Sequence, residues 1–525
     1  MKRIFTIIIC FALLSACSEF LTESPDSEMQ AEDFFSNPNH AFDAVNVLYR
    51  SGCTDFYRTG SYSGSRAMLG SYMTGLYDND YKGQEVHVQH CQNLTLNGHN
   101  LARYFDGFWD ECYNAISKAN FAISNIPNTP GLTQIEKNSL IAEAKFFRAY
   151  NYFYLLKTFG DVPLILEAYN SLENMYVERT NSKTIYNQII DDLLFAITPG
   201  RLQDVPMPKN EFRISRGSAI VLLADIYLNM SGYPVNVIKY KEAAALTRSA
   251  IKSGNYSLIS HGKDETHSAY NILRLSDVED EYLYTIEYDS NIEFNLHQPA
   301  ICYPSEAISW GIFKYSVTNN AFKPTNELLW IYDDQKDLRI QEKQYFHSTL
   351  TYWEDTTRIT RQFETAPYLW HDDKALFETG KTDKDLVVYR YAEILLIAAE
   401  AIAKTEGVTD EAVNYLTDVR SRAYWKTDRN EIVAELSGLS TEQFVQEVWK
   451  ERLREFVLEY KIWSDIQRTR KFPVTNNNHK GEIDFVDVIG HTTIWGKTIQ
   501  EKHLLFPISE NERQRNPNLS QNIGY

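Results

Sequence analysis

The sequence predicts a mainly α protein: a stack of helix pairs, similar to tetratricopeptide repeats, with an irregular, loop-rich part and a few short strands. Residues 146–156 are apolar or aromatic on almost every face, which is typical of a buried helix. Small residues alternate with rings there, so neighbouring helices can approach closely. Residues 215–230 and 388–404 form further apolar helices with small residues at contact positions. The helix spacing is not regular enough to establish a repeat by itself.

The central helix organises the prediction. It lies within residues 142–165, AEAKFFRAYNYFYLLKTFGDVPLI, and follows Thr133. Gly160 stands where a left-handed C-terminal cap would form, and Pro163 prevents continuation of the helix. The remaining elements follow from hydrophobic periodicity. We expect helices at residues 38–49, 101–126, 182–197, 215–230, 239–252, 388–404, 410–422 and within 441–470, and a strand at 281–289.

Two long stretches lack periodicity, residues 52–100 and 290–384. Both are rich in tyrosine, and the second holds four tryptophans. Irregular stretches of this length in a compact protein are usually binding loops. We therefore expect them to form the ligand-binding elaborations of one domain, residues 37–525, whose helical core spans about 101–260 and 386–470.

Composition excludes some functions. The chain has 525 residues, of which 13% are aromatic, and a formal net charge of −18. The charge becomes two units more negative when a leader that holds Lys2 and Arg3 is removed. So acidic a surface argues against nucleic acid as a binding partner and against attraction to anionic lipid headgroups.

The N-terminus predicts a lipoprotein. Residues 1–16 combine a basic start, a short apolar run and small residues, as secretory signals do. Leu14-Ser15-Ala16-Cys17 resembles a bacterial lipobox, in which Cys17 would be acylated; ordinary signal cleavage is the alternative. Residues 18–32 are polar and acidic without periodicity, so we expect residues 17–36 to form the lipidated N-terminus and a flexible tether. Four cysteines remain in the globular part, and spacing alone cannot pair them: Cys53, Cys91, Cys112 and Cys302.

The chain resembles the SusD/RagB family of surface nutrient-binding lipoproteins from Bacteroidetes-type bacteria. Five ordered stretches carry the resemblance. They are residues 142–165, 215–230, 389–401 (YRYAEILLIAAEA) with 419–423, 451–470 and the tail from Phe506-Pro507 to Gly524-Tyr525.

That resemblance implies a non-enzymatic outer-membrane lipoprotein that faces the cell exterior. It would capture an oligosaccharide and pass it to a SusC-like TonB-dependent barrel, with no cofactor. A peptide-binding, RagB-like member is the first alternative. A surface glycosidase is the second, because among 70 acidic residues the sequence leaves a catalytic carboxylate pair open.

The resemblance also places the ligand site near residues 77–81 and 303–315. Sugars present flat C–H faces that aromatic rings cover, with polar side chains at the rim. Trp310 is the first choice for position and size. Trp109 and Trp463 fall in helical patterns, so we expect them in the core. The candidates are Trp310, Tyr77, Asp78, Tyr81, Tyr303 and Tyr315.

Other chemistry is poorly supported. His87, His90 and Cys91 lack a fourth zinc ligand, and Asp78-Asn79-Asp80 lacks the spacing of a calcium loop. Residues 490–498 nearly match a phosphate loop but have one residue too many and no following helix. Residues 60–64 are no nucleophile elbow. We therefore predict no metal site and no catalytic residues.

Overall fold

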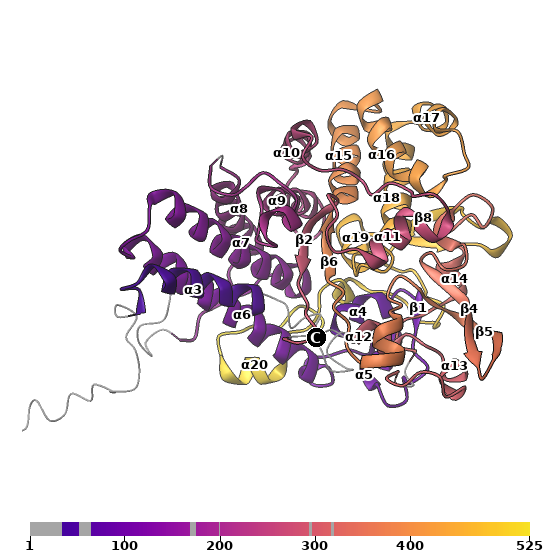
Figure 1. Cartoon of the computed structure of the whole chain (residues 1–525). Coiled ribbons are helices and arrows are strands. Elements are labelled where there is room, and N and C mark those ends of the chain that lie inside the picture. Colours follow the sequence, from indigo (N-terminus) through magenta and orange to yellow (C-terminus); the bar gives the residue numbers. More distant parts are fainter. Residues whose placement is uncertain (1–33, 52–64, 168–174, 199, 293–296, 317–319) are drawn as a thin grey trace, which may run out of the picture.

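The computed structural model describes residues 34–51, 65–167, 175–198, 200–292, 297–316 and 320–525. Helices from the two halves of the chain stack side by side, from α3, α6 and α7 across α8–α10 to α15–α18 (Figure 1). These helices are α3 (Pro38–Ser51), α6 (Ala102–Asn125), α7 (Gln134–Phe159), α8 (Ser182–Ile197), α9 (Arg216–Met230), α10 (Tyr240–Ser253), α15 (Tyr391–Glu406), α16 (Asp410–Ala423), α17 (Arg429–Ser437) and α18 (Thr441–Glu455). The mainly helical fold class is confirmed.

Helix α7 is the buried centre of the stack, as the sequence predicts. Thr133 and Glu136 form a capping box that satisfies the free backbone N–H groups of its first turn. From Leu140 onward almost every residue is buried, and the rings of Phe146 and Tyr150 pack edge-on against Tyr284 of β2. The helix ends at Gly160, whose φ of 72° favours glycine.

Two helix predictions need correction. Residues 388–390 belong to strand β6 (Leu386–Arg390), which pairs with β2 (Tyr282–Ile286), so α15 begins only at Tyr391. The β-branched pair Val387-Val388 suits a strand, and β2 supplies the partner. Residues 441–470 form two helices, α18 and α19 (Ile462–Thr469). The left-handed backbone of Tyr460, with φ of 61°, separates them because an α-helix cannot continue through it.

The loop-rich part lies beside the stack at the lower right of Figure 1. The prediction that residues 52–100 and 290–384 lack regular structure is wrong in part. The described residues there and nearby form α4 (Ser65–Tyr72), β1 (Tyr77–Asp78), α5 (Val86–Gln92), α11 (Ala269–Leu275), α12 (His297–Ile301), α13 (Ser305–Ser309), β3 (Lys323–Pro324), α14 (Asn326–Leu329), β4 (Phe346–Glu354) and β5 (Thr357–Pro367). The C-terminal region adds β7 (Lys471–Thr475), β8 (Ile483–Asp487) and α20 (Glu510–Arg515).

The two loop segments meet. Strand β1 pairs with β3, so that Asp78 lies opposite Lys323. The Tyr72 hydroxyl also donates to the Ala321 carbonyl oxygen, across a sequence separation of 249 residues. Segments that are far apart in sequence therefore build one surface.

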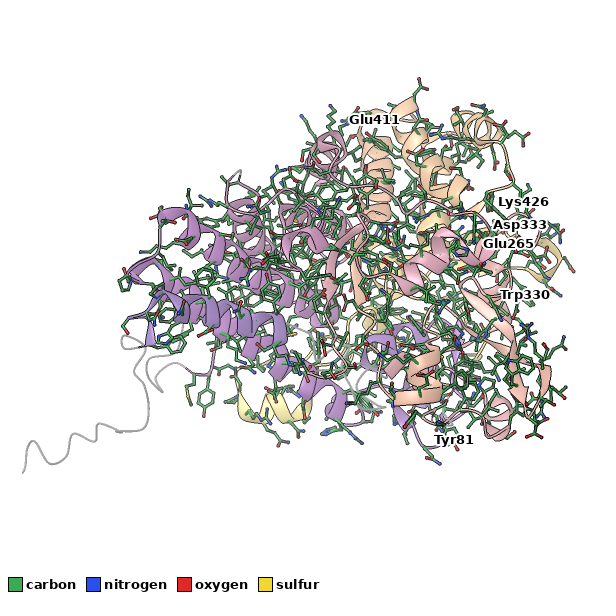
Figure 2. The ribbon with its side chains drawn as sticks, viewed as in Figure 1. Tyr81, Glu265, Trp330, Asp333, Glu411 and Lys426 are labelled. Atoms are coloured by element: carbon green, nitrogen blue, oxygen red, sulfur yellow. The ribbon has the colours of Figure 1, made fainter. Side chains whose placement is uncertain are left out.

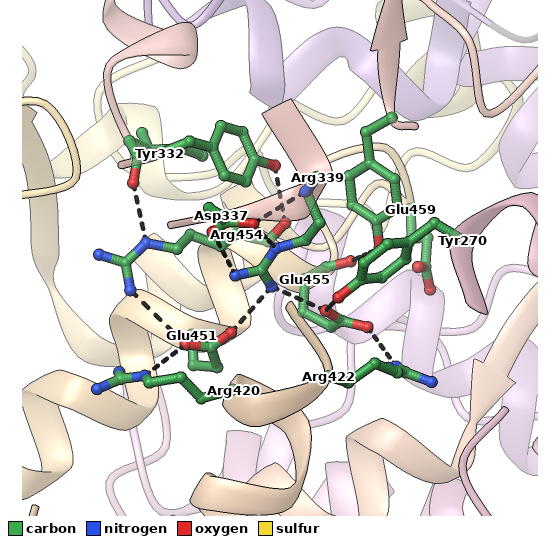
Figure 3. Close-up of polar contacts among 12 residues, drawn as sticks. Tyr270, Tyr332, Asp337, Arg339, Arg420, Arg422, Glu451, Arg454, Glu455 and Glu459 are labelled. Atoms are coloured by element: carbon green, nitrogen blue, oxygen red, sulfur yellow. Dashed lines mark hydrogen bonds and ion pairs between the residues drawn. The ribbon is translucent and has the colours of Figure 1, made fainter. Parts of the chain in front are cut away.

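A buried ion network joins charged residues of the motifs that suggested the family to others outside them (Figure 3). Glu455 of α18 receives hydrogen bonds from Arg339, Arg390 and Arg422, at 2.8, 2.7 and 2.6 Å. Glu281 pairs with the second and third of these arginines, which links β2 to β6 and α16. Charged groups this deep are retained only when paired. The motif residues therefore hold the loop segments against the helix stack.

Glu451, one turn before Glu455, shows the strength of this pairing. Burial pushes the pKa of Glu451 upward, but Arg339, Arg420 and Arg454 outweigh it and hold the pKa at about 2. Glu451 therefore stays ionised at any physiological pH.

Three further observations concern the described residues. None of their helices has the length and apolarity needed to cross a bilayer. Their cysteines, Cys91, Cys112 and Cys302, are buried, and no disulfide joins any two of these three. Trp109 and Trp463 are buried in the core, as predicted.

Candidate ligand-binding site

The hairpin of β4 and β5 carries the candidate site. Its strands run antiparallel, with Tyr352 opposite Ile359 and Leu350 opposite Arg361. The turn closes at Asp355, whose φ is 52°. Since side chains alternate between the two faces of a strand, Leu350 and Tyr352 share one face with Arg361.

An aromatic surface lies on that face. Trp310 follows α13, and its ring is nearly parallel to that of Tyr352, at 22° with 6.4 Å between centroids. The Arg361 guanidinium lies 5.5 and 5.6 Å from the centroids of these two rings. Phe363 packs edge-on against Trp310, at 6.1 Å and 71°. We call the partly exposed set Trp310, Tyr352 and Arg361 the ring face.

A polar cluster lies along the neighbouring strand β3. Lys323 bonds Asp80 at 3.1 Å and Glu364 of β5 at 2.7 Å. The Asn320 side-chain amide donates to Asp80 at 2.9 Å. These groups come from both loop segments. Because side chains alternate along β5, Glu364 lies on the face opposite Arg361 and Phe363, so the polar cluster and the ring face lie on opposite faces of the hairpin.

The structure separates the six sequence-predicted site residues. Tyr77 and Tyr303 are fully buried, so neither offers a ring to solvent. The Tyr77 hydroxyl donates to the Val457 carbonyl oxygen, and the Tyr303 hydroxyl bonds His347 and His371. Tyr303 instead supports the ring face, since its ring packs 6.0 Å from Phe363.

Asp78, Tyr81 and Tyr315 lie closer to the surface. Lys82 and Gln92 donate to Asp78, and these bonds outweigh its burial and lower the pKa of the carboxyl. Tyr81 is partly buried at the edge of the loop part in Figure 2. Tyr315 is 41% exposed and packs on Gly380, apart from the ring face.

Three hairpin residues escaped sequence reasoning: Tyr352, Trp353 and Arg361. Trp353 is 69% exposed and, being next to Tyr352, points to the opposite face. The sequence TLTYWEDTTRITRQFE alternates on both sides of a short turn, which is a hairpin signal that could have located them.

The rival sites gain no support. Burial, followed by the neighbouring charges of Arg103 and His90, lowers the pKa of His87 to about 3, and its ring bonds the Tyr104 hydroxyl at 2.7 Å. No group of three metal-ligating side chains occurs among the residues the structure describes. The near phosphate loop is followed by a four-residue 3-10 turn, Glu501–Leu504, which provides no helix dipole. Residues 60–64 and Cys17 lie outside the described residues.

A carboxyl pair near the ends of β2 and β6 predicts a pH effect. Burial, repulsion from Glu287 and a hydrogen bond with it raise the pKa of Asp385 to about 9, and the Tyr288 amide donates to the same carboxyl at 2.9 Å. The folded chain therefore holds a proton that the unfolded chain, with an ordinary aspartate pKa of 3.8, has released. The free energy of unfolding should fall as pH rises from about 5 to about 8.

Asp385→Asn should remove that slope, because asparagine keeps the shape without titrating. Urea unfolding at several pH values would show the variant to be more stable than the wild type at about pH 8. The exposed Asp484→Asn is the control and should keep the wild-type slope. Parallel pH profiles for Asp385→Asn and the wild type would contradict the assignment.

The fold defines a class: a helical-stack protein with a loop-rich part, which here carries the ring face. The SusD family profile matches residues 223–525, and a profile described as starch-binding associating with outer membrane matches residues 19–228. The chain belongs to the SusD family.

Relatives agree over nearly the whole length. SusD-like protein P2 of Formosa agariphila is 24% identical over 502 residues, which cover 89% of this chain and 91% of that protein. The crystal structure of a SusD superfamily protein from Parabacteroides distasonis is 30% identical and superposes with a TM-score of 0.78, covering 92% of this chain and 99% of the other. Surface glycan-binding protein A from Bacteroides thetaiotaomicron, in complex with laminarihexaose, shares the fold at 17% identity, with a TM-score of 0.69 and coverage of 93% and 99%.

Proposed function

We propose that this protein is a non-enzymatic glycan-binding protein of the cell surface. It captures an oligosaccharide and passes it to a SusC-like TonB-dependent transporter in the outer membrane. The proposal includes acylation of Cys17 as the anchor, residues 17–36 as the tether, and residues 37–525 as one binding domain.

The ring face is the observation that carries the proposal. Trp310 and Tyr352 present two nearly parallel, partly exposed rings, with Arg361 beside both. Flat rings cover the C–H faces of sugars, while the guanidinium donates to ring hydroxyls or the glycosidic oxygen.

Family membership supports the same reading. A fold neighbour is a laminarin-binding SusD-like protein, and the laminarihexaose complex described above is another. Both are under 25% identical to this chain, so they support a glycan as the class of ligand and do not identify the sugar. A tethered protein beside a channel needs only modest affinity, because tethering raises the effective ligand concentration.

Trp310→Ala tests the site. We expect oligosaccharide affinity to fall about 10-fold or more, since the truncation removes the larger ring of the face and the support for Tyr352. Isothermal titration calorimetry would use the soluble chain that begins after Cys17, with laminarihexaose, maltohexaose, cellohexaose and mannohexaose as ligands, and a panel of short peptides.

Trp353→Ala is the matched control. It removes a neighbouring tryptophan that points to the other face of the same hairpin, so affinity should stay within about 2-fold of the wild type. Equal losses in both variants, or none in either, would remove the ring face as the binding surface. Binding of peptides without any oligosaccharide would favour the peptide-binding alternative.

A further inference from the structure

A second concave site lies at the root of the hairpin. A cavity of about 590 Å³ is lined by residues of β6, by the segment after β5 and by the turn between α18 and α19. This volume falls in the range of small-molecule sites. The rim reaches the surface at Leu275 and Asp373, of which the first is 63% exposed, so a ligand can enter from solvent.

Glu459 lines this cavity and carries an unsatisfied carboxylate oxygen. The Glu459 side chain is 9% exposed, and its Oε1 accepts from Arg390 Nε and Nη2 at 3.0 and 2.8 Å. Its Oε2 is buried and has no hydrogen-bond partner among the described residues. Burial raises the pKa of this carboxyl against the pull of Arg390. A buried acceptor left unpaired is costly, so it marks a place where a ligand donor would be stabilising.

Two aromatic rings form a wall beside Glu459. Trp370 and Tyr460 are nearly parallel, at 13° with centroids 6.1 Å apart. Phe322 packs edge-on against Trp370 at 4.7 Å and fixes its position. Tyr460 is held at a φ of 61°, a backbone conformation that is unfavourable for an aromatic residue.

The charges of the lining select against anions. Each basic side chain already has a partner: Lys374 bonds Asp383 at 3.0 Å, and Lys384 bonds Asp277. Arg274 donates to the His371 carbonyl oxygen at 3.0 Å and lies over the Tyr368 ring. Acidic groups outnumber these three cations in the lining even without the protonated Asp385; they are Asp277, Asp372, Asp373, Asp383 and Glu459. A sulfated or uronic acid sugar would meet repulsion here, whereas an uncharged hydroxyl donor would not.

We propose that this cavity is a second carbohydrate subsite, separate from the ring face, which takes the terminal ring of an uncharged oligosaccharide. The Glu459 Oε2 atom accepts a hydrogen bond from a sugar hydroxyl, and the wall of Trp370 and Tyr460 covers a C–H face. The subsite rests on the proposed glycan-binding function. The segment 368–374 leads directly from β5 into the cavity, so the two sites lie on connected chain.

Glu459→Gln tests the subsite. We expect the best-bound neutral hexasaccharide of the panel above to lose about 10-fold in affinity, because the amide replaces an acceptor with a donor. The matched control is Glu482→Gln, an exposed carboxylate between β7 and β8 that belongs to neither site, which should change affinity by less than about 3-fold. Trp370→Leu is the second variant, because Glu459 also pairs with the buried Arg390. It should weaken binding similarly, with the melting temperature as the check on folding. Oligogalacturonate should not bind the wild type.

The outcomes separate the two proposals. Wild-type affinity in folded Glu459→Gln or Trp370→Leu, together with loss in Trp310→Ala, overturns the subsite and leaves the proposed function standing. Preferred binding of oligogalacturonate also overturns it. If no saccharide binds the wild type, the proposed function and the subsite both fail.

Discussion

Glu455→Ala should lower the free energy of unfolding by about 3–5 kcal/mol. The side chain is fully buried and accepts hydrogen bonds from three guanidiniums, those of Arg339, Arg390 and Arg422. Alanine would leave these cations without a shared counter-charge in a site that water cannot reach. The effect exceeds that of a lost contact, because the remaining charges pay their full desolvation cost. Urea unfolding followed by circular dichroism would measure it.

Glu501→Ala is the control for that measurement. Glu501 makes an equally short two-bond pair with Arg470, at 2.6 and 2.7 Å, but both side chains are exposed. Solvent and salt screen such a pair, so its loss should cost less than about 1 kcal/mol. If the free energy of unfolding falls equally in the two variants, burial does not explain the contribution of the ion network to stability.

Gly232→Ala should lower the free energy of unfolding by about 3 kcal/mol. Gly232 follows α9, and a β-carbon there would lie 2.1 Å from the Arg468 carbonyl oxygen and 2.8 Å from the carbonyl carbon. The Tyr233 amide donates to the same oxygen at 3.1 Å, so α9 and α19 meet backbone to backbone. The Arg468 side chain is locked to Glu400 by two bonds of 2.8 and 3.0 Å, which prevents an easy shift. Thermal and urea unfolding would show the loss.

Gly438→Ala provides the comparison. It also follows a helix, but its φ of −82° is ordinary, and a β-carbon there would have no neighbour closer than 3.9 Å. Its stability should change by less than about 0.5 kcal/mol. A similarly small loss of stability in Gly232→Ala would mean that α9 and α19 can move apart to accommodate the added methyl group.

Local patterns predicted the helix stack well, because the residues of a buried helix are apolar on nearly every face and can be recognised without the rest of the chain. The apolar faces of helix α7, its small residues and Gly160 were sufficient to locate it in the sequence. The errors arose where a partner distant in sequence decides the structure. Residues 388–390 form a strand because β2 pairs with them. The helix also breaks after Glu455, and the local periodicity does not indicate this break or the resulting positions of Glu459 and Tyr460.

The candidate site was harder to predict for the same reason. Tyr77 and Tyr81 stand four residues apart in one segment, yet Tyr77 is fully buried because its hydroxyl reaches Val457, 380 residues away. Trp310 was predicted, but its neighbours Tyr352 and Arg361 come from a hairpin whose alternation went unused. The charged motif residues were recognised as family features, and only the structure relates them as one ion network.

The pairing of β1 with β3 has a consequence for biogenesis. Closing a loop of about 245 residues costs roughly 5 kcal/mol of chain entropy, which a two-residue ladder cannot repay alone. The segment that holds β1 must therefore wait for β3, and for Val457 after α18, before its position is fixed. During synthesis from the N-terminus, helices α6–α10 can pack before β3 is available, and β1 is fixed only afterwards.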